Sequence, residues 1–448
     1  MDEWRWMSAA DLGRGIATGD IDPVDLTETY LAAIDAHEHR DRIYARVTHD
    51  RARAEAAAAS VRAKTGMRRG PLDGVPVSWK DLFDTAGIVT EAGTKLLEGR
   101  VPDRDAKVLA DATAAGLVCL GKTHMSELAF SGLGLNPITA TPANVNDPQA
   151  VPGGSSSGAG ASVAFGLAAA GIGSDTGGSV RIPSAWNDLV GFKTTHGRLS
   201  LDGVVPLCLT FDTIGPLCRS VEDANLLFAA LDGGKAIDLH GVSLTGTRLM
   251  VLDSVVFDNI RDAPAQAFDS GVKRLEQAGA QVIRKAFPGL QRAFDVGGPL
   301  FAADSYGYWR DLVEAHPEKM FPQILERIRG GRDVSAADFV AGWNVIHEVR
   351  KEYAAVTAGF DAVIMPTAPI LPPDAERLLS DDAYYKAENL LALRNTRVAN
   401  LMGACALTLP TGVPSCGFML IGPAGGEAAL LRLGAAVEAV LRETQSRN

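Results

Sequence analysis

The sequence contains few cysteines and no long apolar run. Its five cysteines are an odd number among 448 residues, and they lack the paired spacing of a metal site. This usage excludes a scaffold built from disulfides and is typical of reduced, buried thiols, so we expect a cytoplasmic protein. Every apolar run is interrupted well before the roughly 18 residues that a membrane span requires, so no association with a membrane is expected.

Signals for export and for nucleic-acid binding are also missing. Residues 1–6 carry charges of both signs and no apolar segment follows them, so a secretory signal peptide is not expected. Acidic residues outnumber basic ones, 54 to 43, and the net charge of −11 comes without a basic patch that could neutralise phosphates. We therefore expect no nucleic-acid partner. The 46% of hydrophobic residues is ample for a large buried core.

Glycine is abundant, and two glycine-serine turns lie close together at 153–157 and 173–180. Between them, residues 158–170 are almost all small or apolar, which predicts a buried helix that ends at the glycines that follow. A chain that runs out along this helix and then returns can bring Ser155 and Ser179 to the same end of it. Glycine also lets backbone N–H groups point at a ligand, as an oxyanion site requires. The two turns therefore indicate nucleophilic chemistry.

A serine nucleophile needs a base, and none of the eight histidines lies within this block. His124 and His196 are nearest in sequence, and the position of neither identifies it as the base. Lys80 is a candidate of another kind, because it ends the short apolar run 75–79 after a turn. Burial there would lower its pKa from about 10.4 to roughly 7 or 8, at a cost of about 4 kcal/mol of solvation.

At this point the sequence resembles the amidase signature enzymes. The matching blocks are 74–81, 153–156, 175–181, 189–194 and 211–216. Lys80, Ser155 and Ser179 are separated by 75 and 24 residues, as the lysine and the two serines of that family are arranged. The resemblance implies an α/β fold with a large mixed β-sheet flanked by helices on both faces. It also implies a single domain over 1–448, with the signature core at about 70–220 and a divergent insertion at about 233–355.

The resemblance assigns catalytic roles as well. Ser179 is expected to attack the amide carbonyl, and Ser155 is expected to relay the proton between Ser179 and Lys80. The peptide bond between Gly154 and Ser155 is expected to be cis. Besides that of Ser179, the backbone N–H groups expected to bind the oxyanion are those of Thr176, Gly177 and Gly178.

Further residues are expected to support these groups. Asp175 and Arg181 flank the second turn with opposite charges, which favours an ion pair. Ser156 either holds the loop by hydrogen bonds or has a purely structural role. Trp186 departs from the usual family sequence, and it either reshapes the pocket or belongs to a packing layer. One segment resembles the part of the family that lines the substrate cavity. Its candidates for substrate contact are Met125, Glu127, Leu128 and Leu133. The three apolar residues among them are equally compatible with packing in the core.

Residues 116–123 match the phosphate-binding P-loop pattern letter for letter. A true P-loop needs a strand before its first glycine and an open turn between its two glycines. Here a predicted helix at 105–115 precedes Gly116, and residues 117–120 are strand-like. The pattern therefore predicts a helix, a turn and a strand instead of a nucleotide site.

The expected function is hydrolysis of a small-molecule carboxamide through an acyl-enzyme on Ser179, without a metal or other cofactor. Aryl amides, alkyl amides and urea-type substrates remain open, and a homodimer is compatible with the resemblance. One alternative is the glutaminase subunit of a tRNA-dependent amidotransferase, which would require partner subunits. The altered C-terminal part favours a stand-alone enzyme. The other alternative, an inactive binding or scaffold protein, is weakened because Lys80, Ser155 and Ser179 are all present.

Overall fold

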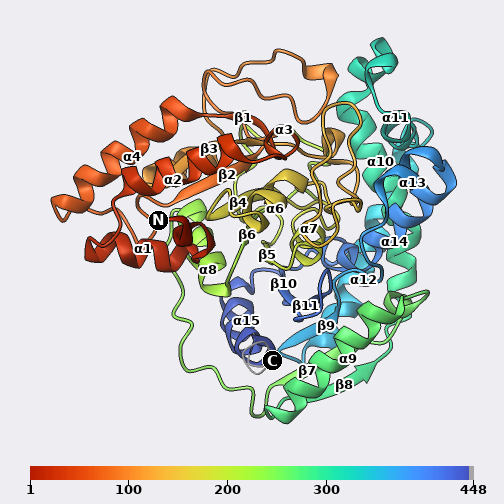
Figure 1. Ribbon diagram of the computed structural model, residues 1–448. Coiled ribbons are helices and arrows are strands. Elements are labelled where there is room, and N and C mark those ends of the chain that lie inside the picture. Colours follow the sequence, from red (N-terminus) through yellow and green to blue (C-terminus); the bar gives the residue numbers. More distant parts are fainter. Residues whose placement is uncertain (443–448) are drawn as a thin grey trace.

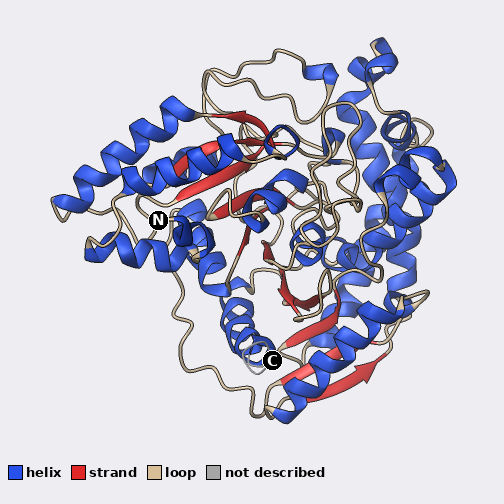
Figure 2. Ribbon diagram, viewed as in Figure 1, coloured by secondary structure: helices blue, strands red, loops and turns tan. Residues whose placement is uncertain are grey.

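The computed structural model describes residues 1–442, whose strands form one mixed β-sheet (Figure 1). The strands are β1 (Tyr44–Val47), β2 (Pro76–Lys80), β3 (Val118–Thr123), β4 (Ala170–Ser174), β5 (Val190–Lys193), β6 (Ile214–Cys218), β7 (Arg248–Leu252), β8 (Gln281–Lys285), β9 (Ala362–Pro366), β10 (Ala406–Pro410) and β11 (Gly417–Ile421). Their order across the 11-stranded sheet is β1-β3-β2-β4-β6-β5-β10-β11-β9-β7-β8. Figure 2 shows the strands in the interior of the molecule with helices around them, which confirms the expected α/β architecture.

Fifteen α-helices flank the sheet within residues 1–442. They are α1 (Ala9–Thr18), α2 (Pro23–Ala36), α3 (Arg40–Ile43), α4 (His49–Lys64), α5 (Lys107–Ala114), α6 (Ser157–Ala164), α7 (Arg181–Trp186), α8 (Val221–Asp232), α9 (Asp262–Gln277), α10 (Leu290–Ala315), α11 (Pro322–Arg329), α12 (Ala336–Thr357), α13 (Ala375–Ser380), α14 (Asp382–Leu401) and α15 (Glu427–Arg442). No helix in this part of the chain is long and apolar enough to cross a membrane.

Local capping chemistry explains where the first helices begin. The Ser8 hydroxyl accepts a hydrogen bond from the Asp11 N–H at 3.0 Å, at the start of α1. Asp22 caps α2 in the same way, and Pro23 occupies the first turn, where its missing N–H costs nothing. The local sequence therefore sets where both helices begin.

Strands β2, β3 and β4 are parallel and fully buried. β2 lies between β3 and β4, and it runs parallel to both of them. The carboxyl ends of these three strands therefore meet at one edge of the sheet. Lys80 is the last residue of β2, and Ser174 is the last residue of β4. This edge is where open α/β sheets place their ligand sites.

The helix predicted at 158–170 is shorter than expected. α6 ends at Ala164, and Gly166 follows with a φ of +68°, a left-handed conformation that ends the helix. The glycines expected to cap it lie inside strand β4 instead. A Cβ atom on Gly171 would lie 2.8 Å from the carbonyl oxygen of Ala159, so glycine lets α6 pack closely against β4. The prediction that the helix reaches Ala170 was wrong.

The segment that matches the P-loop pattern folds as a helix, a turn and a strand, as predicted. Gly116 follows α5, and Lys122 lies inside β3. The Lys122 ammonium donates hydrogen bonds to Asp81 at 3.2 Å and to Thr90 at 2.9 Å, and its side chain is fully buried. This lysine therefore stabilises the sheet from inside the protein.

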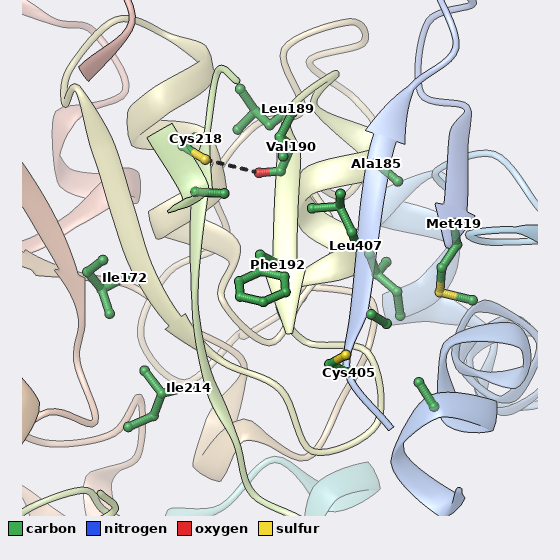
Figure 3. Close-up of a cluster of buried hydrophobic side chains, with 14 of the residues drawn as sticks. Ile172, Ala185, Leu189, Val190, Phe192, Ile214, Cys218, Cys405, Leu407 and Met419 are labelled. Carbon is green, nitrogen blue, oxygen red and sulfur yellow. Dashed lines mark hydrogen bonds between the residues drawn. The ribbon is translucent and has the colours of Figure 1, made fainter. Parts of the chain in front are cut away.

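The middle of the sheet forms the apolar core that supports the site (Figure 3). Phe192, Ile214 and Leu407 come from strands β5, β6 and β10 and have no exposed surface. Burying each such side chain stabilises the fold by about 1.5–3 kcal/mol. The thiol of Cys218 donates a weak hydrogen bond to the carbonyl of Val190 at 3.8 Å. All five cysteines are buried and unpaired, as the sequence indicated.

Residues 233–355 contribute to the same sheet. Strands β7 and β8 extend it beyond β9, and helices α10, α11 and α12 pack together beside α14 (Figure 1). This arrangement matters for function because α10, α11 and α14 each bring side chains to one cavity.

Candidate active site

Lys80 lies at the carboxyl end of β2 with no exposed surface. Its ammonium nitrogen donates hydrogen bonds to Ser155 Oγ at 2.7 Å and to Ser174 Oγ at 2.8 Å. Within residues 1–442, no carboxylate forms an ion pair with it. Burial lowers the pKa of Lys80 to about 7, although the negative charges of Asp212 and Asp175 oppose this shift. The neutral amine is therefore well populated near neutral pH.

The first glycine-serine turn holds Ser155 against this lysine. The Gly154–Ser155 peptide bond is cis, as expected. A Cβ atom on Gly154 would lie 2.6 Å from the backbone nitrogen of Gly134, so only glycine fits there. The Ser156 hydroxyl donates to the carbonyl of Ser174 at 3.2 Å, which ties the turn to β4. Of the two roles left open for Ser156, the structure favours holding the loop.

Ser179 lies in the second turn and faces a cavity. The Ser156 N–H donates to the carbonyl oxygen of Ser179 at 3.2 Å, so the two turns are joined through their backbones. The Ser179 hydroxyl makes no hydrogen bond within residues 1–442. The structure thus brings Lys80 and Ser155 into direct contact, whereas Ser179 is connected to them through the backbone alone.

The second turn presents a row of unused backbone donors. The N–H groups of residues 176–179 donate no hydrogen bond within residues 1–442. The turn is held from behind, because Thr396 on α14 donates its hydroxyl to the carbonyl of Gly177 at 2.7 Å. Gly178 has a φ of +141°, and a Cβ atom there would lie 2.1 Å from Thr396 Oγ1. Such a fixed turn with free N–H groups is suited to binding an oxyanion.

Asp175 and Arg181 form the expected ion pair, with 2.8 Å between Arg181 Nη2 and Asp175 Oδ1, and both side chains are fully buried. This contact holds the pKa of Asp175 well below its usual value, although burial alone would raise it. Arg181 also donates to Asn400 Oδ1 at 2.7 Å, and the Val180 N–H donates to Asp175 at 3.1 Å. The pair therefore fixes the turn between β4 and α7 against α14.

Asp212 supports the same turn from the other side. Its carboxylate accepts hydrogen bonds from the Thr176 hydroxyl and from the N–H groups of Leu207 at 3.0 Å and Cys208 at 3.1 Å. Burial raises the pKa of Asp212 to about 6, against the opposing effect of these hydrogen bonds. Asp212 belongs to the matching block 211–216, but its sequence context predicts no role for it.

Ser179 faces a cavity whose empty space, together with the part open to solvent, has a volume of about 290 Å³. Its walls come from the second turn, from the segment 129–131, from the loop at 207 and from helices α10, α11 and α14. The lining residues are Ala129, Phe130, Ser131, Thr176, Gly177, Ser179, Leu207, Phe301, Arg327, Leu393 and Arg397.

The residues predicted to contact substrate do not line this cavity. Met125, Leu133 and Trp186 are fully buried and none of them lines the cavity. The Trp186 indole donates to the carbonyl of Ile370 at 3.2 Å, and its ring lies 3.0 Å from the position of a Cβ atom on Gly153. Of the two roles left open for Trp186, the structure favours packing. The segment that contains Met125 and Leu133 does reach the cavity, but through residues 129–131.

One face of α14 and the serine at the end of β4 belong to the site although they were not predicted from the sequence. Leu393 and Arg397 line the cavity, and Asn400 bonds to the second turn one helical turn further along. These residues recur every three or four positions, so they lie on one face of the helix. The polar members on this otherwise buried face were the sequence pattern that could have indicated a role in the site. Ser174 directly precedes the matching block 175–181, and no sequence pattern marked it as a partner of Lys80.

The part of the chain that the structure describes contains no group of three or more His, Cys, Asp or Glu side chains positioned to hold a metal ion. The chemical groups that meet at this site are a buried amine, three serines and four free backbone donors. Such a set can deprotonate a hydroxyl, form a covalent ester and stabilise an oxyanion.

Comparison with known proteins identifies relatives along nearly the whole chain. A profile of the Amidase family matches residues 25–431. The 2-amino-5-chloromuconic acid deaminase of Comamonas testosteroni is 35% identical over 97% of both chains. A glutamyl-tRNA(Gln) amidotransferase subunit from Streptomyces avermitilis is 30% identical over 98% of this chain and 95% of its own.

Solved structures of amidases resemble this chain over nearly its whole length. A crystal structure of an amidase superposes with a TM-score of 0.87 at 32% identity and covers 97% of this chain and 99% of its own. The peptide amidase of Stenotrophomonas maltophilia superposes with a TM-score of 0.83 at 26% identity, covering 97% of each chain.

Proposed function

Because the chain belongs to the Amidase family and is an enzyme that hydrolyses an amide C–N bond, we propose that Lys80, Ser155 and Ser179 carry out this reaction. The observation that supports the proposal best is the buried contact of 2.7 Å between Lys80 Nζ and Ser155 Oγ. A lysine without a carboxylate partner and with a pKa of about 7 is a usable general base at neutral pH.

In the first half of the reaction, neutral Lys80 accepts the hydroxyl proton of Ser155, and Ser155 accepts the proton of Ser179. The Ser179 oxygen forms a bond to the amide carbonyl carbon, and the carbonyl oxygen becomes an oxyanion. The N–H groups of residues 176–179 donate to this oxyanion. The contact between the two serine hydroxyls forms when substrate is bound, because catalytic hydrogen bonds commonly tighten only in that complex.

In the second half, the C–N bond breaks and the nitrogen leaves as ammonia or an amine, with the proton returned from Lys80 through Ser155. The acyl group remains on Ser179 as an ester. A water molecule then gives its proton to the same relay and attacks the ester carbonyl, which releases the acid and restores the Ser179 hydroxyl. No cofactor takes part in these steps.

Ser174 and Asp212 are positioning residues in this proposal. Ser174 accepts a second hydrogen bond from Lys80 Nζ, which fixes the direction of the nitrogen toward Ser155. Asp212 holds the Thr176 hydroxyl, which keeps the row of N–H donors pointing into the cavity.

The test is ammonia release by the purified chain alone on a panel of aryl amides, alkyl amides, glutamine and asparagine. Ser179→Ala serves as the blank, because it removes the nucleophile and leaves the cavity nearly unchanged. Release that disappears in Ser179→Ala supports the proposal. Release that persists in Ser179→Ala would overturn the assignment of the nucleophile.

A second candidate is a glutaminase that passes ammonia to partner proteins. It is favoured by the 30% identity with the Streptomyces amidotransferase protein over 98% of this chain. Activity on glutamine alone, increased by added partner proteins, would support it.

The relative with 35% identity is a deaminase, so the panel also includes a 2-amino unsaturated acid.

A further inference from the structure

Two arginines face the cavity in front of Ser179, and neither has an acidic partner. Arg397 lies on α14 and Arg327 on α11. Within residues 1–442, Arg397 makes no hydrogen bond and no ion pair, and its guanidinium lies 5.6 Å from the ring centre of Phe301. A Cβ atom on Gly177 would lie 3.7 Å from Arg397 Nε, so this side chain lies directly beside the proposed oxyanion turn.

Arg327 is held in place by the protein, but most of its guanidinium N–H groups make no hydrogen bond in the described chain. Its Nη1 donates to the carbonyl of Phe130 at 2.6 Å, and its guanidinium lies 4.3 Å from the centre of the Phe130 ring. No carboxylate pairs with it in the described chain. A guanidinium has five N–H donors, and this arrangement uses one of them on the protein. The remaining donors are available to a ligand.

Placing two like charges at one cavity is costly unless an anion joins them. Burial and the nearby charge of Arg327 lower the pKa of Arg397 to about 9. Arg329, two residues further along α11, differs from them in having an acidic partner, because its Nη2 lies 2.7 Å from Glu314 Oε2.

The remaining walls limit what the anion can belong to. Leu207, Phe301 and Leu393 add apolar surface to the same cavity. The cavity therefore suits a small molecule with a short hydrocarbon part, an amide at one end and an anion at the other.

We propose that the substrate is the monoamide of a short dicarboxylic acid, with its carboxylate bound by Arg327 and Arg397. This inference rests on the proposed function, because it places the amide carbonyl at Ser179. A carboxylate is the planar anion that an arginine binds through two parallel hydrogen bonds. The arginine pair thus selects the substrate, and the serines and the lysine act on its other end.

The kinetic test compares the monoamides of succinic, glutaric and adipic acid with the corresponding diamides. Each diamide has the same shape but lacks the negative charge. After allowance for its two equivalent amides, we expect kcat/KM of the wild type to be about 10- to 100-fold higher for the best monoamide. This ratio should fall by a similar factor in Arg397→Gln and in Arg327→Gln. Arg329→Gln on the same helix is the matched control and should keep the wild-type ratio.

Binding to Ser179→Ala separates this inference from the proposed function. Calorimetry should show tighter binding of the best monoamide than of its diamide, and the difference should disappear when Arg397→Gln is added. Arg397→Lys, which keeps the charge, should retain part of the difference and guards against a folding defect in the glutamine variant. Charge-dependent binding without turnover of any amide would support the carboxylate site and contradict the proposed function.

The opposite results would overturn the inference. Turnover of monoamides and diamides at equal rates by the wild type would show that the cavity does not select a carboxylate. An equal loss of rate on both classes in Arg397→Gln would show that this arginine supports the neighbouring turn instead of binding substrate.

Discussion

The lowered pKa of Lys80 links the fold to the pH dependence of the reaction. Burial lowers this pKa from 10.5 to about 7. At pH 7.5 an amine with a pKa of 7 is about three-quarters neutral, whereas an ordinary lysine is neutral in about one molecule in a thousand. We therefore expect kcat/KM to rise tenfold per pH unit below about pH 7 and to level off above it.

Replacing the base should remove this acid limb. Lys80→Met keeps most of the side-chain volume without the amine, and we expect the rate to fall by about 100- to 10,000-fold. The remaining rate should vary little between pH 5.5 and 8.5. Ammonia release on one amide, measured across this range for both proteins, checks the prediction. An acid limb with the same midpoint in Lys80→Met would refute the assignment of Lys80 as the base.

The same shift predicts an effect on stability. Unfolded Lys80 binds its proton up to about pH 10.5, whereas the folded protein releases it above about pH 7. The unfolded state thus binds more protons between these values, so stability rises with pH across this window. Below pH 7, where Lys80 is charged in both states, burying this charge lowers the free energy of unfolding by about 5 kcal/mol. Lys80→Met removes this destabilisation but also loses two hydrogen bonds of about 1 kcal/mol each. The balance favours the variant, so at pH 6 Lys80→Met should unfold at a higher urea concentration than the wild type.

Three further substitutions test the surroundings of the site. Asp212→Asn removes a negative charge that raises the pKa of Lys80, so the acid limb of the pH–rate profile should move to lower pH; a move to higher pH would contradict this electrostatic coupling. Asp175→Asn leaves Arg181 buried without its partner and should lower the free energy of unfolding by about 3–5 kcal/mol in urea titrations. A loss below about 1 kcal/mol would mean that the pair is dispensable. Gly178→Ala adds a Cβ atom 2.1 Å from a threonine hydroxyl, so kcat should fall at least about tenfold. An unchanged kcat would argue against the turn as the oxyanion site.

Local patterns in the sequence were enough to predict much of the fold near the site. The apolar run that carries Lys80, and the helix, turn and strand around Gly116, depend on residues that lie close together in the chain. The helix after Ser156 was harder to bound, because the small residues near Gly171 suit a tightly packed helix and a buried strand equally well. The strand forms because β4 pairs with β2 on one side and β6 on the other.

The sequence by itself determined which residues we propose as catalytic, because the two glycine-serine turns and the lysine stand in short, recognisable segments. Only the tertiary structure decided what surrounds them. Ser174, Arg327 and Arg397 come from a strand and two helices far apart in sequence, and their shared position results from packing of the whole sheet and its helices. The lowered pKa of Lys80 likewise depends on burial among distant segments, because desolvation by the assembled fold, not the neighbouring residues in the chain, stabilises the neutral amine.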